Sequence, residues 1–128
     1  MLRLSQSSKS KVQLGSSTFA AGKAAQLQPQ IARDGPLLFQ GLRGKGGDLY
    51  VQHLGADPAH GWLAFTADAP APAGCVLNWQ PSRHTLDCSG VSFPADGHGL
   101  DQFAVTIDGK GRVIVDLTAQ TGTTPRPN

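Results

Sequence analysis

The chain has 128 residues, of which 39% are hydrophobic and 16% charged, and this composition is typical of one globular domain rather than a disordered segment. Its formal net charge of +2 and its scattered Lys and Arg residues argue against a nucleic-acid partner. No stretch is apolar enough to predict a membrane-spanning helix, and the Ser/Lys/Gln-rich residues 1–17 are interpreted as a flexible tail or linker.

The first candidate element is the segment TFAAGKAAQLQPQ, residues 18–30. It is the best helix candidate in the chain, but Gly22 and Pro29 interrupt it. Glycine and proline both weaken a helix interior, and proline also removes a backbone donor. We therefore expect no stable amphipathic helix here.

The rest of the chain predicts short strands separated by turns, in keeping with its 16 Gly and 9 Pro residues. The clearest hairpin joins residues 102–108 and 112–117 through the turn GKG, because apolar residues alternate along both segments. A count of about eight to ten strands predicts an all-β fold, a small antiparallel barrel or sandwich. Seven of the predicted strands have clear bounds, at residues 36–42, 48–54, 61–67, 75–79, 83–88, 102–108 and 112–117.

Catalytic motifs are absent from the sequence. No serine lies in a G-x-S-x-G pattern, and GLRGKGG matches neither the dinucleotide-binding nor the P-loop spacing. His53 and His60 flank a turn, and we expect both to be exposed. The sequence therefore favours a protein that is not an enzyme.

Two cysteines, Cys75 and Cys88, remain as candidates for chemistry, with three interpretations. They form one disulfide, they are two free thiols, or they contribute to a metal site with His84 and His98. Zinc accepts two Cys and two His ligands, but neither cysteine has the near partner that structural zinc sites show. The simpler prediction places His84 on a solvent-facing strand and His98 in a turn.

The order and spacing of several segments resemble the Rieske iron–sulfur family over roughly residues 20–117. These segments are GCVLNW, TLDC, SF, ADG and FAVTIDGKGRVIVDL, in chain order. The resemblance implies a Rieske-like β domain over residues 18–118, whose cluster-binding subdomain corresponds to about residues 68–98. Residues 119–128 then form a flexible C-terminal tail.

The resemblance fails at the cluster ligands. The family's first ligand pair falls on Pro70 and Pro72, which offer neither thiolate nor imidazole, and only Cys88 stands at a position of the second pair. A Rieske [2Fe–2S] centre needs two Cys and two His. We therefore expect no cofactor, and [2Fe–2S] enters only by family analogy.

The family also has a disulfide between the two cluster loops, and Cys75 matches its first cysteine. The segment after Cys88 is shorter than in the family, which lets Cys88 take the role of the second. The resemblance thus implies a Cys75–Cys88 disulfide. Such a bond favours a periplasmic or extracellular location, after removal of an N-terminal signal or anchor.

These expectations combine into a non-catalytic structural or interaction module that has lost its cluster. It would bind another protein, as an accessory part of a cell-envelope or respiratory assembly. One alternative is an electron-transfer component of an oxidoreductase complex, by family analogy. The other is a small metal-binding protein that uses His84, Cys88 and His98.

Overall fold

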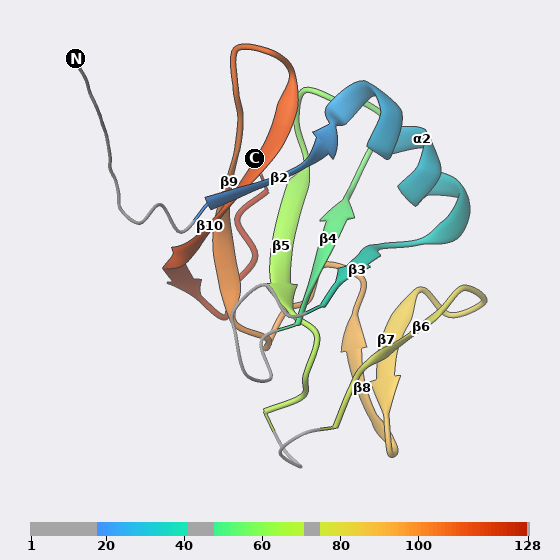
Figure 1. The fold of residues 1–128 in the computed structure, drawn as a ribbon. Coiled ribbons are helices and arrows are strands. Elements are labelled where there is room, and N and C mark those ends of the chain that lie inside the picture. Colours follow the sequence, from blue (N-terminus) through green and yellow to red (C-terminus); the bar gives the residue numbers. More distant parts are fainter. Residues whose placement is uncertain (1–17, 41–47, 71–74, 128) are drawn as a thin grey trace.

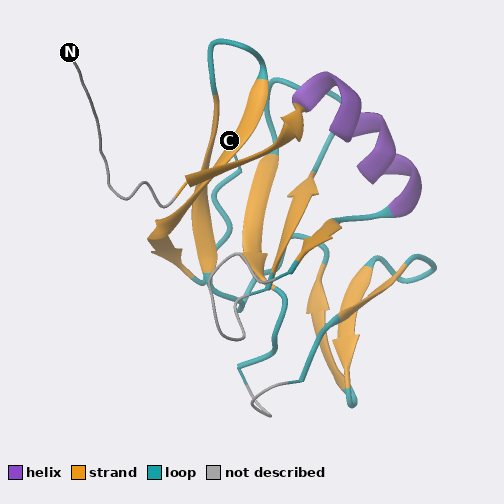
Figure 2. Ribbon diagram, viewed as in Figure 1, coloured by secondary structure: helices purple, strands orange, loops and turns teal. Residues whose placement is uncertain are grey.

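The computed structural model describes residues 18–40, 48–70 and 75–127, and Figures 1 and 2 show two antiparallel sheets with one helix in this part of the chain. Six strands form the large sheet in the order β2-β10-β9-β5-β4-β3, and three form the small sheet in the order β6-β7-β8. The predicted all-β class is therefore confirmed. The strands are β2 (Thr18–Lys23), β3 (Leu37–Phe39), β4 (Leu49–His53), β5 (Trp62–Thr66), β6 (Asn78–Gln80), β7 (Thr85–Cys88), β8 (Val91–Pro94), β9 (Gln102–Ile107) and β10 (Arg112–Gly122).

The helix α2 (Ala24–Asp34) contradicts the expectation that this segment would form none. Ala24, Leu27 and Ile31 recur at helical spacing and pack against the core of the large sheet. Pro29 lies inside the helix but is exposed, so the backbone hydrogen bond that it removes is lost on the solvent side. Gly22 lies one element earlier, in β2. No helix in the described ranges is long and apolar enough to span a membrane.

The large sheet curls into a half-barrel whose two edge strands approach each other. Phe19 on β2 and Phe39 on β3 lie with ring centroids 5.2 Å apart, although these strands stand at opposite ends of the strand order. The predicted hairpin is confirmed, because β9 and β10 pair with Val113 opposite Ile107 and Val115 opposite Val105. β10 continues to Gly122, past the predicted domain boundary at residue 118.

Strands β4 and β5 are buried on both faces. Leu49, Val51, Trp62 and Ala64 belong to the core beneath α2. The alternate residues of the same two strands face a second core, which the small sheet covers. This second core contains Tyr50, Leu63, Phe65, Ala67, Ala69, Leu77, Leu86, Cys88 and Leu100. Burial on both faces explains why these strands are continuous apolar runs rather than alternating ones.

The small sheet presents one apolar and one polar face. Trp79, Leu86 and Phe93 occupy one cross-strand row and pack against the second core. Asn78, Asp87 and Ser92 form the neighbouring row on the opposite face, because side chains alternate along each strand. The hairpin predicted around Gln80–Ser82 exists, but its second strand begins at Thr85, later than the predicted residue 83.

Candidate functional site

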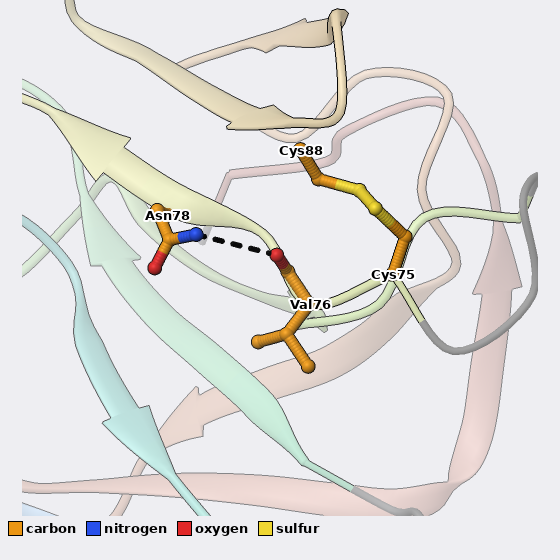
Figure 3. Close-up of a disulfide and its surroundings, with 4 residues drawn as sticks. All are labelled: Cys75, Val76, Asn78 and Cys88. Atoms are coloured by element: carbon orange, nitrogen blue, oxygen red, sulfur yellow. Dashed lines mark hydrogen bonds between the residues drawn. A yellow bond between two sulfur atoms is a disulfide. The ribbon is translucent and has the colours of Figure 1, made fainter.

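Cys75 and Cys88 form a disulfide, as the family resemblance predicted (Figure 3). Their Cα atoms are 6.0 Å apart, a separation typical of disulfides. Cys88 ends β7 and is only 5% exposed, so the bond anchors the small sheet within the second core. The chain contains two cysteines, and both are therefore in this bond.

Backbone pairing brings Cys75 to this place. Ala69 N donates to Cys75 O at 2.9 Å, and Leu77 N donates to Ala67 O at 2.8 Å, so the segment after β5 pairs with the segment that leads into β6. The side-chain amide of Asn78 donates to Val76 O at 3.5 Å in the same segment (Figure 3). Cys75 therefore returns to the end of the large sheet, where Cys88 meets it.

The residues at the predicted ligand positions do not fit a Rieske cluster. Cys88, the one candidate thiolate, is bonded to Cys75, and Pro70 has no side-chain atom that can coordinate iron. Pro72 lies outside the described residues. Within the described ranges, no three His, Cys, Asp or Glu side chains come together in a way that could hold a metal ion. The residues described at these positions therefore do not supply the two thiolates and two imidazoles that a Rieske centre needs.

The structure does not bring His84, Cys88 and His98 together. His84 lies in the turn before β7 rather than on a strand, with φ of 55°, and its exposed ring meets Trp79 edge-on at 5.9 Å. His98 is exposed in a turn, and its backbone N–H donates to Asp96 Oδ1 at 2.9 Å. The metal-site alternative thus gains no support from the geometry of the described residues.

His53 is buried, and the expectation that it would be exposed is wrong; His60 is exposed as expected. The ring of His53 packs on Trp62 with centroids 4.6 Å apart. Its Nε2 lies 2.8 Å from Asp57 O and 2.6 Å from His60 O, so the histidine closes the turn that follows β4. The burial of His53 follows from the strand register, because His53 pairs directly opposite Trp62 in a part of the sheet that is buried on both faces. The register of these two strands was not part of the prediction.

Two hydrogen bonds link the large sheet to the segments that flank the small sheet, and a close approach links the end of α2 to β6. The hydroxyl of Tyr50 donates to Leu77 O at 2.7 Å, and the amide of Gln52 donates to Ala95 O at 2.9 Å. Gly35, which ends α2 with φ of 91°, lies so close to the indole of Trp79 that no Cβ fits between them. Burial raises the pKa of Tyr50, so the phenol stays protonated and donates.

Asp87 in the small sheet and Asp108 in the β9–β10 turn have carboxylates whose charged forms are stabilised by hydrogen bonds. The hydroxyl of Ser92 donates to Asp87 at 2.6 Å and, with Arg83, lowers the pKa of that carboxyl. Hydrogen bonds from Arg112 lower the pKa of Asp108 in the β9–β10 turn. A general base for work near neutral pH needs the opposite shift, so neither carboxylate resembles one.

A cleft of about 230 Å³ opens where α2, the end of β4 and the β6–β7 turn meet. Arg33, Gly35, His53, Leu54, Trp79 and His84 are among its lining residues. Sequence reasoning missed this cleft, because its walls come from segments far apart in the chain.

Comparison with known proteins identifies the fold. No family model matches the chain, and no curated protein does. Among solved structures, the chain is similar to the crystal structure of the cyanobacterial plasma membrane Rieske protein PetC3 from Synechocystis PCC 6803. The TM-score is 0.55 at 19% sequence identity, over 76% of this chain and 97% of that one. At this identity the likeness shows the fold alone, and the fold is Rieske-like.

Proposed function

We propose that this chain is a Rieske-like domain that has lost its [2Fe–2S] cluster and serves as a non-catalytic structural or interaction module. The observation that carries the proposal is the Cys75–Cys88 disulfide. It takes the one cysteine that stands at a ligand position, in a chain with no third cysteine. The proposal keeps the fold and gives up its redox chemistry, which is allowed because fold does not fix function.

Packing at the former cluster site supports this role. The second core includes Leu86 and Cys88, which belong to β7 of the small sheet, and Leu77, which precedes β6. Tyr50 and Gln52 fix that sheet to the large one through two hydrogen bonds. The small sheet is thus held firmly against the large one, which is compatible with a role as an interaction surface.

The location proposed is extracytoplasmic, within a cell-envelope assembly. A structural disulfide persists in oxidising compartments and is rare in a reducing cytosol. The structural neighbour is described as a plasma membrane protein, which agrees with this assignment. The proposed partner is another protein.

Intact-mass and spectroscopic measurements on protein purified without a histidine tag test the proposal. We expect a colourless protein whose mass lies two hydrogens below the fully reduced value. After dithionite reduction, electron paramagnetic resonance should show no iron–sulfur signal. A signal from a reduced [2Fe–2S] centre would overturn the proposal and favour the electron-transfer alternative.

A further inference from the structure

The cleft between α2 and the small sheet is lined by several polar side chains whose hydrogen-bond donors are not all in use. Three of its side chains have unused hydrogen-bonding capacity: the indole N–H of Trp79, the guanidinium of Arg33 and the imidazole of His84. None of them donates a side-chain hydrogen bond to another lining residue in the described part of the chain. The cleft therefore offers donors that a bound molecule can use.

Each of these donors reaches the cleft from an exposed or partly exposed position. The indole N–H of Trp79 makes no hydrogen bond with the described residues, and it is not among the fully buried polar atoms that lack a partner. Arg33 uses only Nε–H and one Nη2–H, both toward Asp34 at 3.1 to 3.3 Å, and so retains three of its five N–H donors. The ring nitrogens of His84 have no partner within the described ranges.

The remaining polar side chains of the cleft are already engaged within the protein. Gln52 accepts from His53 N at 3.1 Å through Oε1 and donates to Ala95 O through Nε2. His53 Nε2 lies between two backbone carbonyls. No Asp or Glu occurs among the described lining residues, so the side chains of the cleft offer a ligand more donors than acceptors.

Charge at the cleft favours a neutral ligand over a carboxylate. Arg33 is paired with Asp34, and both stand in the last turn of α2. The C-terminal end of a helix carries a partial negative charge of about half an elementary charge, which opposes an incoming anion. A neutral acceptor such as a peptide carbonyl meets much less opposition, because its oxygen carries only a partial negative charge.

Apolar side chains line the rest of the cleft. Leu54, Pro81 and Trp79 provide aliphatic, pyrrolidine and aromatic surface around the donors. Leu54 is 37% exposed, which is unusual for a large hydrophobic residue in this protein. The cleft thus combines an exposed apolar surface with unpaired donors.

We propose that this cleft binds a proline-rich segment of a partner protein in the polyproline II conformation. Proline has a backbone carbonyl but no N–H, so such a segment consists of acceptors and apolar rings. Its backbone makes no internal hydrogen bonds, which leaves every carbonyl available, and its preformed shape lowers the entropy lost on binding. This chemistry complements a cleft of donors and apolar surface. The inference names the partner class for the interaction role proposed above and rests on that role.

Titration of the ¹⁵N-labelled protein with an acetylated, amidated decaproline peptide tests the inference by NMR. We expect shifts concentrated at the indole N–H of Trp79 and the backbone amides of Gly35 and Leu54. Trp79→Phe keeps an aromatic ring and removes the N–H, so binding should weaken about twofold to tenfold, as for one neutral hydrogen bond. A Gly/Ser peptide of equal length should bind much more weakly.

A matched pair of leucine variants keeps the test informative if Trp79→Phe fails to fold. Leu54 and Leu38 are similarly exposed, at 37% and 40%, but only Leu54 lines the cleft. Leu54→Ser should weaken decaproline binding and Leu38→Ser should leave it unchanged. Equal binding of the Gly/Ser peptide, equal effects of the two variants, or no shifts at the cleft would overturn the inference. None of these outcomes alters the iron content, so loss of the cluster is judged separately.

Discussion

The hydroxyl of Tyr50 donates a hydrogen bond to the carbonyl oxygen of Leu77 across 2.7 Å, and this bond joins the two sheets. Tyr50 stands in the middle of β4, and Leu77 directly precedes β6. Both residues belong to the second core, where an unpaired carbonyl is costly. The bond therefore helps to hold the small sheet against the large one.

Tyr50→Phe should destabilise the protein while leaving its fold intact. The substitution leaves Leu77 O buried without its donor, which costs about 1–3 kcal/mol of unfolding free energy. Urea unfolding measures this change. Ser92→Ala removes an exposed hydroxyl hydrogen bond to Asp87 and serves as the control, with an expected cost below that of Tyr50→Phe. Equal costs for the two variants would contradict the role assigned to Tyr50.

Stability should fall at alkaline pH through the same residue. Burial raises the pKa of Tyr50, so the folded state holds this proton at pH values where the unfolded state loses it. The stabilisation is fully present below the unfolded-state pKa of about 10 and is lost as pH rises through the folded-state pKa. The difference in unfolding free energy between the wild-type protein and Tyr50→Phe should therefore shrink with rising pH. A constant difference would contradict the expected titration.

Gly35→Ala should be more destabilising than Gly55→Ala. The two glycines have φ of 91° and 90°, so both substitutions force an L-residue into the left-handed half of backbone space. A Cβ on Gly35 also collides with the indole of Trp79, whereas a Cβ on Gly55 meets nothing within 4 Å. The extra cost should be about 1–3 kcal/mol, as for overpacking. Thermal or urea unfolding of both variants measures it, and equal stabilities would show that the Trp79 contact does not constrain Gly35.

Reduction of the Cys75–Cys88 bond should destabilise the chain by about 3 kcal/mol, the value expected for a loop of this length. Urea unfolding with and without reductant measures the effect. The double variant Cys75→Ala/Cys88→Ala should unfold at the same urea concentration in both conditions, which controls for other actions of the reductant. An unchanged wild-type midpoint after verified reduction would show that the bond contributes nothing to stability.

Strands that bury one face were predictable from the sequence, whereas features that depend on packing between distant segments were not. The β9–β10 hairpin follows from the alternation of Phe103, Val105 and Ile107 with small or polar neighbours. The helix α2 was not predicted, because a proline such as Pro29 disfavours a helix interior when local sequence alone is considered. The stripe of Ala24, Leu27 and Ile31 packs on the core, and this tertiary contact outweighs the loss of one exposed hydrogen bond.

In the candidate site, too, features marked by sequence motifs were predictable and features that depend on packing between distant segments were not. The family resemblance predicted the disulfide, since Cys75 matched the first cysteine of the family's pair and the shortened segment after Cys88 let Cys88 take the place of the second. The burial of His53 depends on its cross-strand partner Trp62, which lies beyond a turn. The cleft depends on Gly35 meeting Trp79, residues that no local pattern connects.

The iron and acid-labile sulfide content of the purified protein tests the central claim most directly. The protein should be expressed with an adequate iron supply, purified without oxygen, and assayed both before and after reduction of the Cys75–Cys88 bond. Loss of the cluster predicts iron and sulfide at background level in both states, because the chain has only two cysteines, and no group of His, Cys, Asp or Glu side chains in residues 18–40, 48–70 and 75–127 could hold a metal. Two irons and two sulfides per chain, in either state, would contradict it.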